Sequence, residues 1–526
     1  MGVRVTLPGL GQWKPQGNCQ ASCPVARARS GGFSVCASLL AILISTATVP
    51  AGLSAQTSMT PQTPAQSPAP SPAQPARTWQ WTLTNLTRIE SWHFFEPPPA
   101  GGDPDYALVA NRFRFGVSRT WLRFDLNAAA QYVQFGGLPT GAVGPGPLGT
   151  GALYYDHSGR TTSRQIYLRT INVAARLPRG VRLQAGRFGY TSGSESSSGR
   201  QKVEAVKRAR VDSRLIGEFE WSLYQRAFDG VRGDVDRKRW HLTAAWLRPT
   251  QGGFEESAGA SLSGIDVAVA TMTLRPDVLL PATDLALFAA HYDDDRPVSA
   301  RPDNTGLSTS RVDVAIPTFG ASAVGSTSAG RGDADWLAWF AGQAGSWYGQ
   351  PHRAWSLAIE AGYQWKTRWQ PWVRAGYLHA SGDPDAADAR HGTFFPMLPT
   401  VRKYSFTTAY APMNLRDAFA EVILRPSPRA TVRADVRRLD LAEAADRWYA
   451  GSGATQQRGT SFGYAGRRSG GATELGTVIE GAADVAVARR WSVNGFVGVI
   501  HGGAVVRSVF AGDWLRFLYL ESVLQF

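Results

Sequence analysis

Arginine side chains at alternate positions along several short segments are the groups in this sequence best suited to bind a solute. Those opposite an apolar stripe are Arg112, Arg114, Arg123, Arg182, Arg239, Arg374, Arg433 and Arg437. Acidic residues assigned to the same face are Asp125, Glu360, Glu421, Asp435 and Glu474. A guanidinium stays charged and can hold a carboxylate through two parallel hydrogen bonds. The pattern therefore predicts a row of sites for a carboxylated solute, with the acidic residues fixing some of the arginines.

The segments that carry these arginines repeat their apolar residues with a period of two, which is the period of a β-strand. The repeat is clear in residues 121–132, 239–247 and 355–365. A soluble β-sandwich alternates in the same way and is the main alternative. Aromatic residues at both ends of several apolar faces, and charge on the polar faces, favour a barrel with a wet interior in a membrane.

The closing segment 517–526 is an alternating strand that ends on an aromatic residue. A strand in lipid must pair along both edges, so such a strand implies a closed barrel. Short connections at residues 177–180 and 425–429 fit periplasmic turns. Long polar tracts that fit extracellular loops are 136–163, 190–212, 293–334, 380–398 and 450–472. We therefore expect residues 78–526 to form an all-β transmembrane antiparallel barrel of 16 to 18 strands.

The first 77 residues have a different character. Residues 1–55 contain Arg27 and Arg29, then the apolar run 33–49 and a small-residue exit, as a secretory signal peptide does. A single membrane anchor is the alternative, but the run is short and is followed by proline-rich sequence. Residues 56–77, rich in Pro, Ala, Ser and Gln, are expected to be a disordered leader.

Composition excludes several classes of protein. The mean hydropathy of −0.20 is too low for a helical membrane protein, whereas a barrel hides its apolar residues in alternate positions. All three cysteines lie within residues 1–55, so the mature chain is expected to contain no disulfide, thiolate metal site or cysteine nucleophile. The formal net charge is +14, and residues 1–77 contain only five of the basic residues and no acidic ones, so the mature chain stays cationic.

The usual catalytic and metal-binding motifs are missing from the sequence. The eight histidines include no HExxH motif and no pair four residues apart. Serine occurs without a GxSxG motif, and glycine-rich tracts lack the Lys-Ser/Thr ending of a phosphate loop. The acidic run at residues 293–295 is expected to be a solvated loop rather than a cation site. We therefore expect no catalytic residue, no cofactor and no metal.

Two stretches resemble signature segments of the alginate-export family of outer-membrane barrels. Residues 214–232 read RLIGEFEWSLYQRAFDGVR, and residues 393–449 contain TFFPMLPTVRKY, NLRD and LAEAADRWY. The turn at residues 380–383 and the closing GDWLRFLYLESVLQF are similar to that family as well. The resemblance implies an 18-stranded barrel whose arginine-rich lumen passes anionic polysaccharide, and it adds Arg226 and Arg232 to the lumen set.

The chain departs from the family pattern in two places. Residues 186–188 read Gly-Arg-Phe, whereas the family's GRQ-type strand would continue here with polar and acidic residues. The tract 192–210, SGSESSSGRQKVEAVKRAR, looks like an insertion.

The sequence thus predicts a non-enzymatic porin or exporter in the bacterial outer membrane, with passive, electrostatically guided passage of an anionic polysaccharide or related organic anion. The expected partners are that solute, outer-membrane lipid and lipopolysaccharide, and the barrel-assembly machinery, with no nucleic acid. Two alternatives remain, a general porin for small solutes and an outer-membrane hydrolase. For the arginines, the alternative is a buried ladder of ion pairs that fills the lumen.

Overall fold

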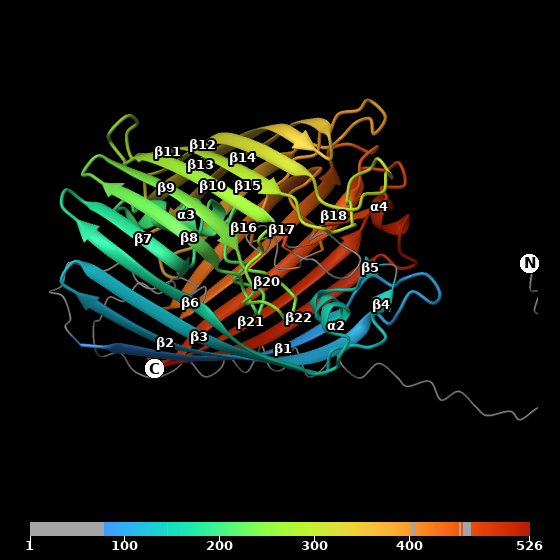
Figure 1. Cartoon of the computed structure of the whole chain (residues 1–526), viewed down its shortest axis with the longest axis horizontal. Coiled ribbons are helices and arrows are strands. Elements are labelled where there is room, and N and C mark those ends of the chain that lie inside the picture. Colours follow the sequence, from blue (N-terminus) through green and yellow to red (C-terminus); the bar gives the residue numbers. More distant parts are fainter. Residues whose placement is uncertain (1–77, 145, 401–406, 408, 452–453, 456–463) are drawn as a thin grey trace, which may run out of the picture. The chain divides into compact units, whose positions relative to one another are not determined.

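The computed structural model describes residues 78–526 except 145, 401–406, 408, 452–453 and 456–463. The predicted signal peptide and leader lie outside the described residues. In the described part, eighteen strands form one antiparallel sheet in which each strand pairs with the next. The sheet closes where β1 pairs with β22, from Thr84 opposite Gln525 to His93 opposite Arg516 (Figure 1). The predicted all-β barrel is confirmed at the upper end of its predicted size.

The barrel strands in chain order are β1 (Gln80–His93), β2 (Asp105–Trp121), β3 (Phe124–Gly136), β6 (Ser163–Leu177), β7 (Val181–Phe188), β8 (Phe228–Asp236), β9 (Trp240–Pro249), β10 (Ile265–Leu274), β11 (Thr283–Asp294), β12 (Val314–Ala329), β13 (Gly332–Trp347), β14 (Gln350–Trp365), β15 (Trp372–Ala380), β16 (Leu415–Ser427), β17 (Ala430–Leu441), β20 (Glu474–Ala488), β21 (Trp491–Gly502) and β22 (Trp514–Gln525). Two short hairpins pair β4 (Val143–Gly144) with β5 (Gly146–Pro147) and β18 (Trp448–Gly451) with β19 (Tyr464–Arg467). The helices are α2 (Thr150–Ser158), α3 (Gln201–Arg210) and α4 (Ala504–Arg507).

The strands turn one apolar face outward. Ile359 of β14 has 56% of its surface exposed on that face, while its neighbour Glu360 is buried on the inner side. Outward aromatic residues gather near both ends of the strands: Trp79, Trp81, Trp121, Trp365 and Trp491 near the end where β1 starts and β22 ends, and Trp246, Trp355 and Trp514 near the other. An apolar band between two aromatic girdles is the surface that a barrel presents to lipid.

One predicted strand is divided in the structure. Residues 121–132 were expected to be continuous, but β2 ends at Trp121 and β3 begins at Phe124. Leu122 has a φ of 49°, so Leu122 and Arg123 form a tight turn. A two-residue hairpin turn continues the alternation without a break, so the period alone cannot locate it.

The connections are short at the end where β1 starts and β22 ends, and at the other end they are long except for the two-residue turn that joins β13 to β14. We assign the first end to the periplasm, because outer-membrane barrels have short periplasmic turns and long extracellular loops. The predicted turns at residues 177–180 and 425–429 are confirmed within two residues at each end. The predicted loop 293–334 is wrong, because it contains β12. That strand is rich in Gly, Ala and Ser and lacks a bulky apolar stripe.

The long connection 189–227 and the described part of the connection 381–414 fold into the barrel. Ile216 and Leu398 form a parallel bridge, and the Gly217 N–H donates to the Leu398 carbonyl over 2.8 Å. Trp221 packs 5.0 Å from the ring of Tyr519 on the inner side of β22. The loops and the inner wall therefore share one hydrophobic core.

No helix in the described ranges is long and apolar enough to cross a membrane.

Candidate functional site

Three arginines on neighbouring strands face the lumen in its periplasmic half. Arg176 of β6 pairs in register with Arg182 of β7, and Arg182 in turn lies opposite Asp234 of β8. Arg232 is 2.8 Å from Asp234, Arg182 is 3.9 Å from the same carboxylate, and Arg176 is 3.4 Å from Asp125. The side chains of Arg176 and Arg182 are 39% and 37% exposed. This group, Arg176, Arg182 and Arg232, is called the arginine cluster. Its three guanidiniums have two carboxylates within 4.0 Å, and Arg176 and Arg182 are open to water.

Neutral amides extend the arginine cluster along the wall. Gln184 accepts a hydrogen bond from Arg182 over 3.0 Å and donates to Asn172 over 2.9 Å. Asn127 donates to the same Asn172 oxygen over 3.5 Å. Amides can both donate to and accept from sugar hydroxyls, while guanidiniums bind carboxylates. The wall therefore offers the two kinds of polar group that an acidic sugar requires.

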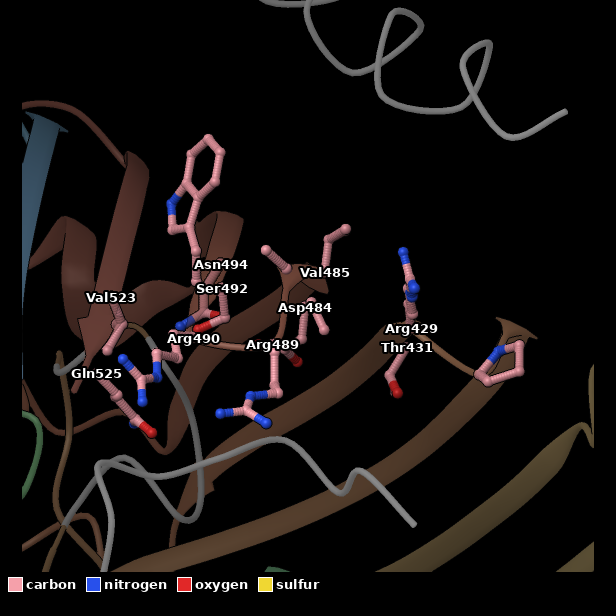
Figure 2. Close-up of a pocket in the computed structure, with 14 residues that line it drawn as sticks. Arg429, Thr431, Asp484, Val485, Arg489, Arg490, Ser492, Asn494, Val523 and Gln525 are labelled. Atoms are coloured by element: carbon pink, nitrogen blue, oxygen red, sulfur yellow. The ribbon is translucent and has the colours of Figure 1, made fainter. Parts of the chain in front are cut away.

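A pocket of about 80 Å³ lies at the periplasmic mouth, at the ends of β17, β20, β21 and β22. Its charged lining residues are Arg429, Arg489, Arg490 and Asp484. Figure 2 shows these arginines around the polar side chains of the pocket. We call Arg429, Arg489 and Arg490 the mouth arginines. Within the described residues, none of the three has a carboxylate within 4.0 Å of its guanidinium nitrogens, so they are available to a solute anion.

Two of the predicted lumen arginines are engaged in buried ion pairs. Arg374 lies 2.6 Å from Asp335 and 3.0 Å from Glu360. Arg437 lies 2.8 Å from Asp417 and 3.0 Å from Asp435. All of these side chains are buried. Four predicted residues therefore form buried ion pairs, as expected for a ladder of ion pairs that fills the lumen: Arg374, Arg437, Glu360 and Asp435.

Arg112 and Arg114 face inward as predicted but lie beneath the loop 189–227. Arg112 is buried, and Arg114 donates to the side-chain oxygen of Gln131 over 2.9 Å and to that of Gln225 in the loop. The wall at this point of β2 is thus covered by the chain itself, and Arg114 binds the loop through Gln225.

The remaining predicted arginines occupy three different environments. Arg226 is fully buried among the loops, where it donates to the Pro399 carbonyl over 3.4 Å. Arg433 faces the lumen 3.7 Å from Glu421. The placement of Arg123 and Arg239 on the lumen wall is wrong, because both lie exposed in turns that follow β2 and β8.

Sequence reasoning missed Arg176 and the mouth arginines. Arg176 is separated from the clear alternation by a bulge, since the register of β3 with β6 shifts between Ala129 and Ala130. Such an extra residue exchanges the two faces of a strand. Pairing Arg176 with Arg182 across the short turn would have found it. The mouth arginines lie in or beside turns, where side chains do not alternate between two faces, so the two-residue period cannot predict their direction.

Two acidic predictions are corrected. Glu474 is not on the lumen face; it is exposed and pairs with Arg438 over 2.9 Å, beside a register shift at Leu439. The run 293–295 is not simply a solvated loop, because Asp294 ends β11 and is buried 2.7 Å from Arg296. In the part of the chain that the structure describes, no group of three or more His, Cys, Asp or Glu side chains is placed to hold a metal ion.

The family model described as alginate export matches residues 187–509, which is more than half of the chain. The chain belongs to the alginate-export family. The resemblance predicted from residues 214–232 and 393–449 is therefore confirmed. A comparison with curated proteins found no match.

Solved porin structures share the barrel fold. OccK2 of Pseudomonas aeruginosa in complex with glucuronate has a TM-score of 0.54 at 9% identity, over 86% of this chain and 99% of that one. OccAB2 of Acinetobacter baumannii has a TM-score of 0.55 at 8% identity, over 85% and 98%. OpdK of Pseudomonas aeruginosa with vanillate has a TM-score of 0.51 at 8% identity, over 85% and 98%. At such identities the likeness shows the fold. This family member is a porin-like barrel of the bacterial outer membrane.

Proposed function

We propose that this alginate-export family member is a passive channel for an anionic saccharide or a related organic anion. The solute meets the mouth arginines at the periplasmic end and the arginine cluster farther along the lumen. Passage is diffusion guided by charge, with no covalent step and no cofactor. Each contact is weak and repeated, because a solute that bound tightly at one site would block the channel.

The observation that carries this proposal is the water-exposed excess of guanidiniums in the arginine cluster. Asp234 serves both Arg182 and Arg232, so one carboxylate offsets two cations there. A cleft lined by one sign of charge raises the local concentration of the opposite ion. The neighbouring amides of Gln184, Asn127 and Asn172 suit hydroxyl groups, which favours a sugar acid over a bare inorganic anion.

The ligands bound in two structurally similar porins support an organic anion as the solute. OccK2 was solved with glucuronate and OpdK with vanillate, and both ligands are organic carboxylates. A barrel of this kind can therefore accept a carboxylate solute, and in this chain the groups best placed for it are Arg176, Arg182 and Arg232.

The test is the reversal potential of single channels in planar bilayers across a KCl gradient. We expect anion selectivity, and we expect glucuronate or a uronate oligosaccharide added at the periplasmic side to reduce the chloride current. Cation selectivity would overturn the proposal. Liposome swelling that ignores solute charge would indicate the general porin instead, and turnover of lipid or peptide by the purified barrel would indicate the hydrolase.

We also propose that residues 1–55 are removed as an export signal and that residues 56–77 remain as a periplasmic leader. The intact mass of the protein purified from outer membranes tests this assignment. A mass that includes the apolar run 33–49 would contradict it.

A further inference from the structure

The loop between β7 and β8 reaches through the lumen to its periplasmic end. It leaves β7 at Phe188, on the extracellular side. Arg200 nevertheless pairs with Asp277, which lies in the periplasmic turn between β10 and β11. Arg275 of that turn donates to the Ser197 carbonyl over 3.1 Å. The helix α3 starts at this point and returns along the inner wall.

Basic residues of α3 contact carboxylates of the wall at successive depths. Lys202 lies 3.4 Å from Asp335 of β13, and its ammonium sits 3.3 Å from the ring centre of Trp372. One turn and a half later, Lys207 lies 3.3 Å from Asp284 of β11.

The C-terminal end of α3 completes this contact with the wall. Arg210 lies 2.8 Å from Glu360 of β14, and Arg214, just beyond the helix, lies 3.0 Å from the same carboxylate. The buried carboxylates Asp335, Asp284 and Glu360 therefore each have a cation from this loop.

The sequence of α3 explains why it forms a helix and why charge dominates its contact with the wall. Glu204 accepts a hydrogen bond from the Ser198 N–H over 2.6 Å, and basic residues fill the last turn, so both ends suit the helix dipole. Val203 and Val206, three positions apart, bury apolar side chains in the core, and the partly buried Ala205 packs against it. So small an apolar face leaves ion pairs as the main determinant of where α3 lies.

The wall beneath α3 is acidic without the helix. In the stretch that α3 covers, the described lumen-facing charges of β10–β15 are Asp284, Asp335, Glu360, the single guanidinium of Arg374 and, at the periplasmic margin, Asp333, which pairs with Lys366. Arg374 is shared between Asp335 and Glu360, so the wall alone has an excess of negative charge. With Lys202, Lys207, Arg210 and Arg214 in place, that excess is cancelled.

We propose that α3 is a specificity-determining insert, a cationic lining that cancels the acidic wall of β11–β14 and so sets the charge preference of the channel. The inference assumes that the barrel conducts ions, which is part of the proposed function, but it does not assume that the wild type prefers anions. It assigns a role to the tract 192–210, which the sequence analysis identified as an insertion.

The experiment replaces residues 198–210 by a Gly/Ser tract of equal length and measures conductance and reversal potential in planar bilayers. We expect a larger conductance and a shift of selectivity toward cations by several fold, because water and salt gain access to Asp284 and Asp335, which lose Lys207 and Lys202. Adding Asp284→Asn and Asp335→Asn to the replaced protein should restore most of the selectivity while the larger conductance remains. Heat-modifiable migration on gels verifies that each barrel is folded.

Point variants test the role of α3 without replacing residues 198–210. Lys202→Gln and Lys207→Gln together should shift selectivity in the same direction by less, and Lys202→Arg should not. Lys238→Gln together with Arg239→Gln, which removes the same two charges from the exposed turn before β9, is the matched control.

The outcomes separate this inference from the proposed function. An unchanged permeability ratio in both the replacement and the double lysine variant would overturn the inference. A cation-selective wild type whose selectivity still moves toward cations after replacement would overturn the proposed function and leave the role of α3 standing.

Discussion

Arg210 of α3 lies 2.8 Å from Glu360 of β14, although 150 residues separate them in the chain. Glu360 also contacts Arg214 and Arg374, so one buried carboxylate joins the lumen loop to two strands of the wall. The C-terminal end of α3 is thereby fixed to the wall of the barrel by charge pairs.

Removing the carboxylate of Glu360 should lower the stability of the folded protein strongly. Glu360→Gln leaves three guanidiniums buried without their shared partner, and breaking a buried pair from one side costs about 3–5 kcal/mol. We expect a lower urea midpoint and faster trypsin cleavage in the loop 189–227. The matched control is Glu474→Gln, whose exposed pair with Arg438 should contribute about 0–1 kcal/mol. Equal losses for the two variants would argue against the central role of Glu360.

Reversing a charge in the arginine cluster should lower anion selectivity. Arg182→Glu changes a water-exposed guanidinium that faces the lumen into a carboxylate beside Asp234. We expect the ratio of anion to cation permeability to fall several fold in bilayer recordings. Arg123→Glu makes the same change of charge in an exposed turn and should have a smaller effect. A larger effect from Arg123→Glu would place the selective region at the turns instead.

The destabilisation caused by a charge on the lipid-facing surface should depend on its depth in the membrane. Ile359→Arg places a cation at an exposed mid-strand position of β14 and should destabilise the barrel by about 2–4 kcal/mol. Val487→Arg, near the periplasmic end of β20, should cost about 0–1 kcal/mol because the side chain can reach the interface. Urea titration of both variants refolded in lipid vesicles measures the difference. Equal costs would indicate that Ile359 does not lie at mid-membrane depth.

The extracellular loop 381–414 should loosen as pH rises through the pKa of one carboxyl group. Burial, and then the charge of Asp446, raise the pKa of Asp383 to about 6. The unfolded carboxyl has a lower pKa, so this group favours the ordered loop at acidic pH and the advantage is lost as pH rises through about 6. Amide exchange in residues 381–392 should therefore be slower at pH 5 than at pH 7.5, after correction for intrinsic rates. Asp383→Asn should remove the difference, and a difference that persisted in this variant would assign it to another group.

Alternation alone determined the barrel and the two faces of most strands. A pleated strand turns successive side chains to opposite sides, and lipid outside with water inside separates the apolar and charged sets. Arg112, Arg114 and Arg182 were placed on the inner face for this reason, and the structure has them there. The alternation failed where the chain leaves the regular pleat, as at the turn that holds Arg123 and the bulge before Arg176.

Only the tertiary structure decided which inward arginines reach water. Arg182 is exposed and Arg374 is buried, although both occupy inner positions on strands of similar pattern. The difference arises because α3, within the loop 189–227, covers the wall at Arg374, whereas Arg182 keeps an exposed side chain. Such coverage depends on contacts such as Arg210 with Glu360, between segments far apart in the chain, and a repeat of two residues carries information only about near neighbours.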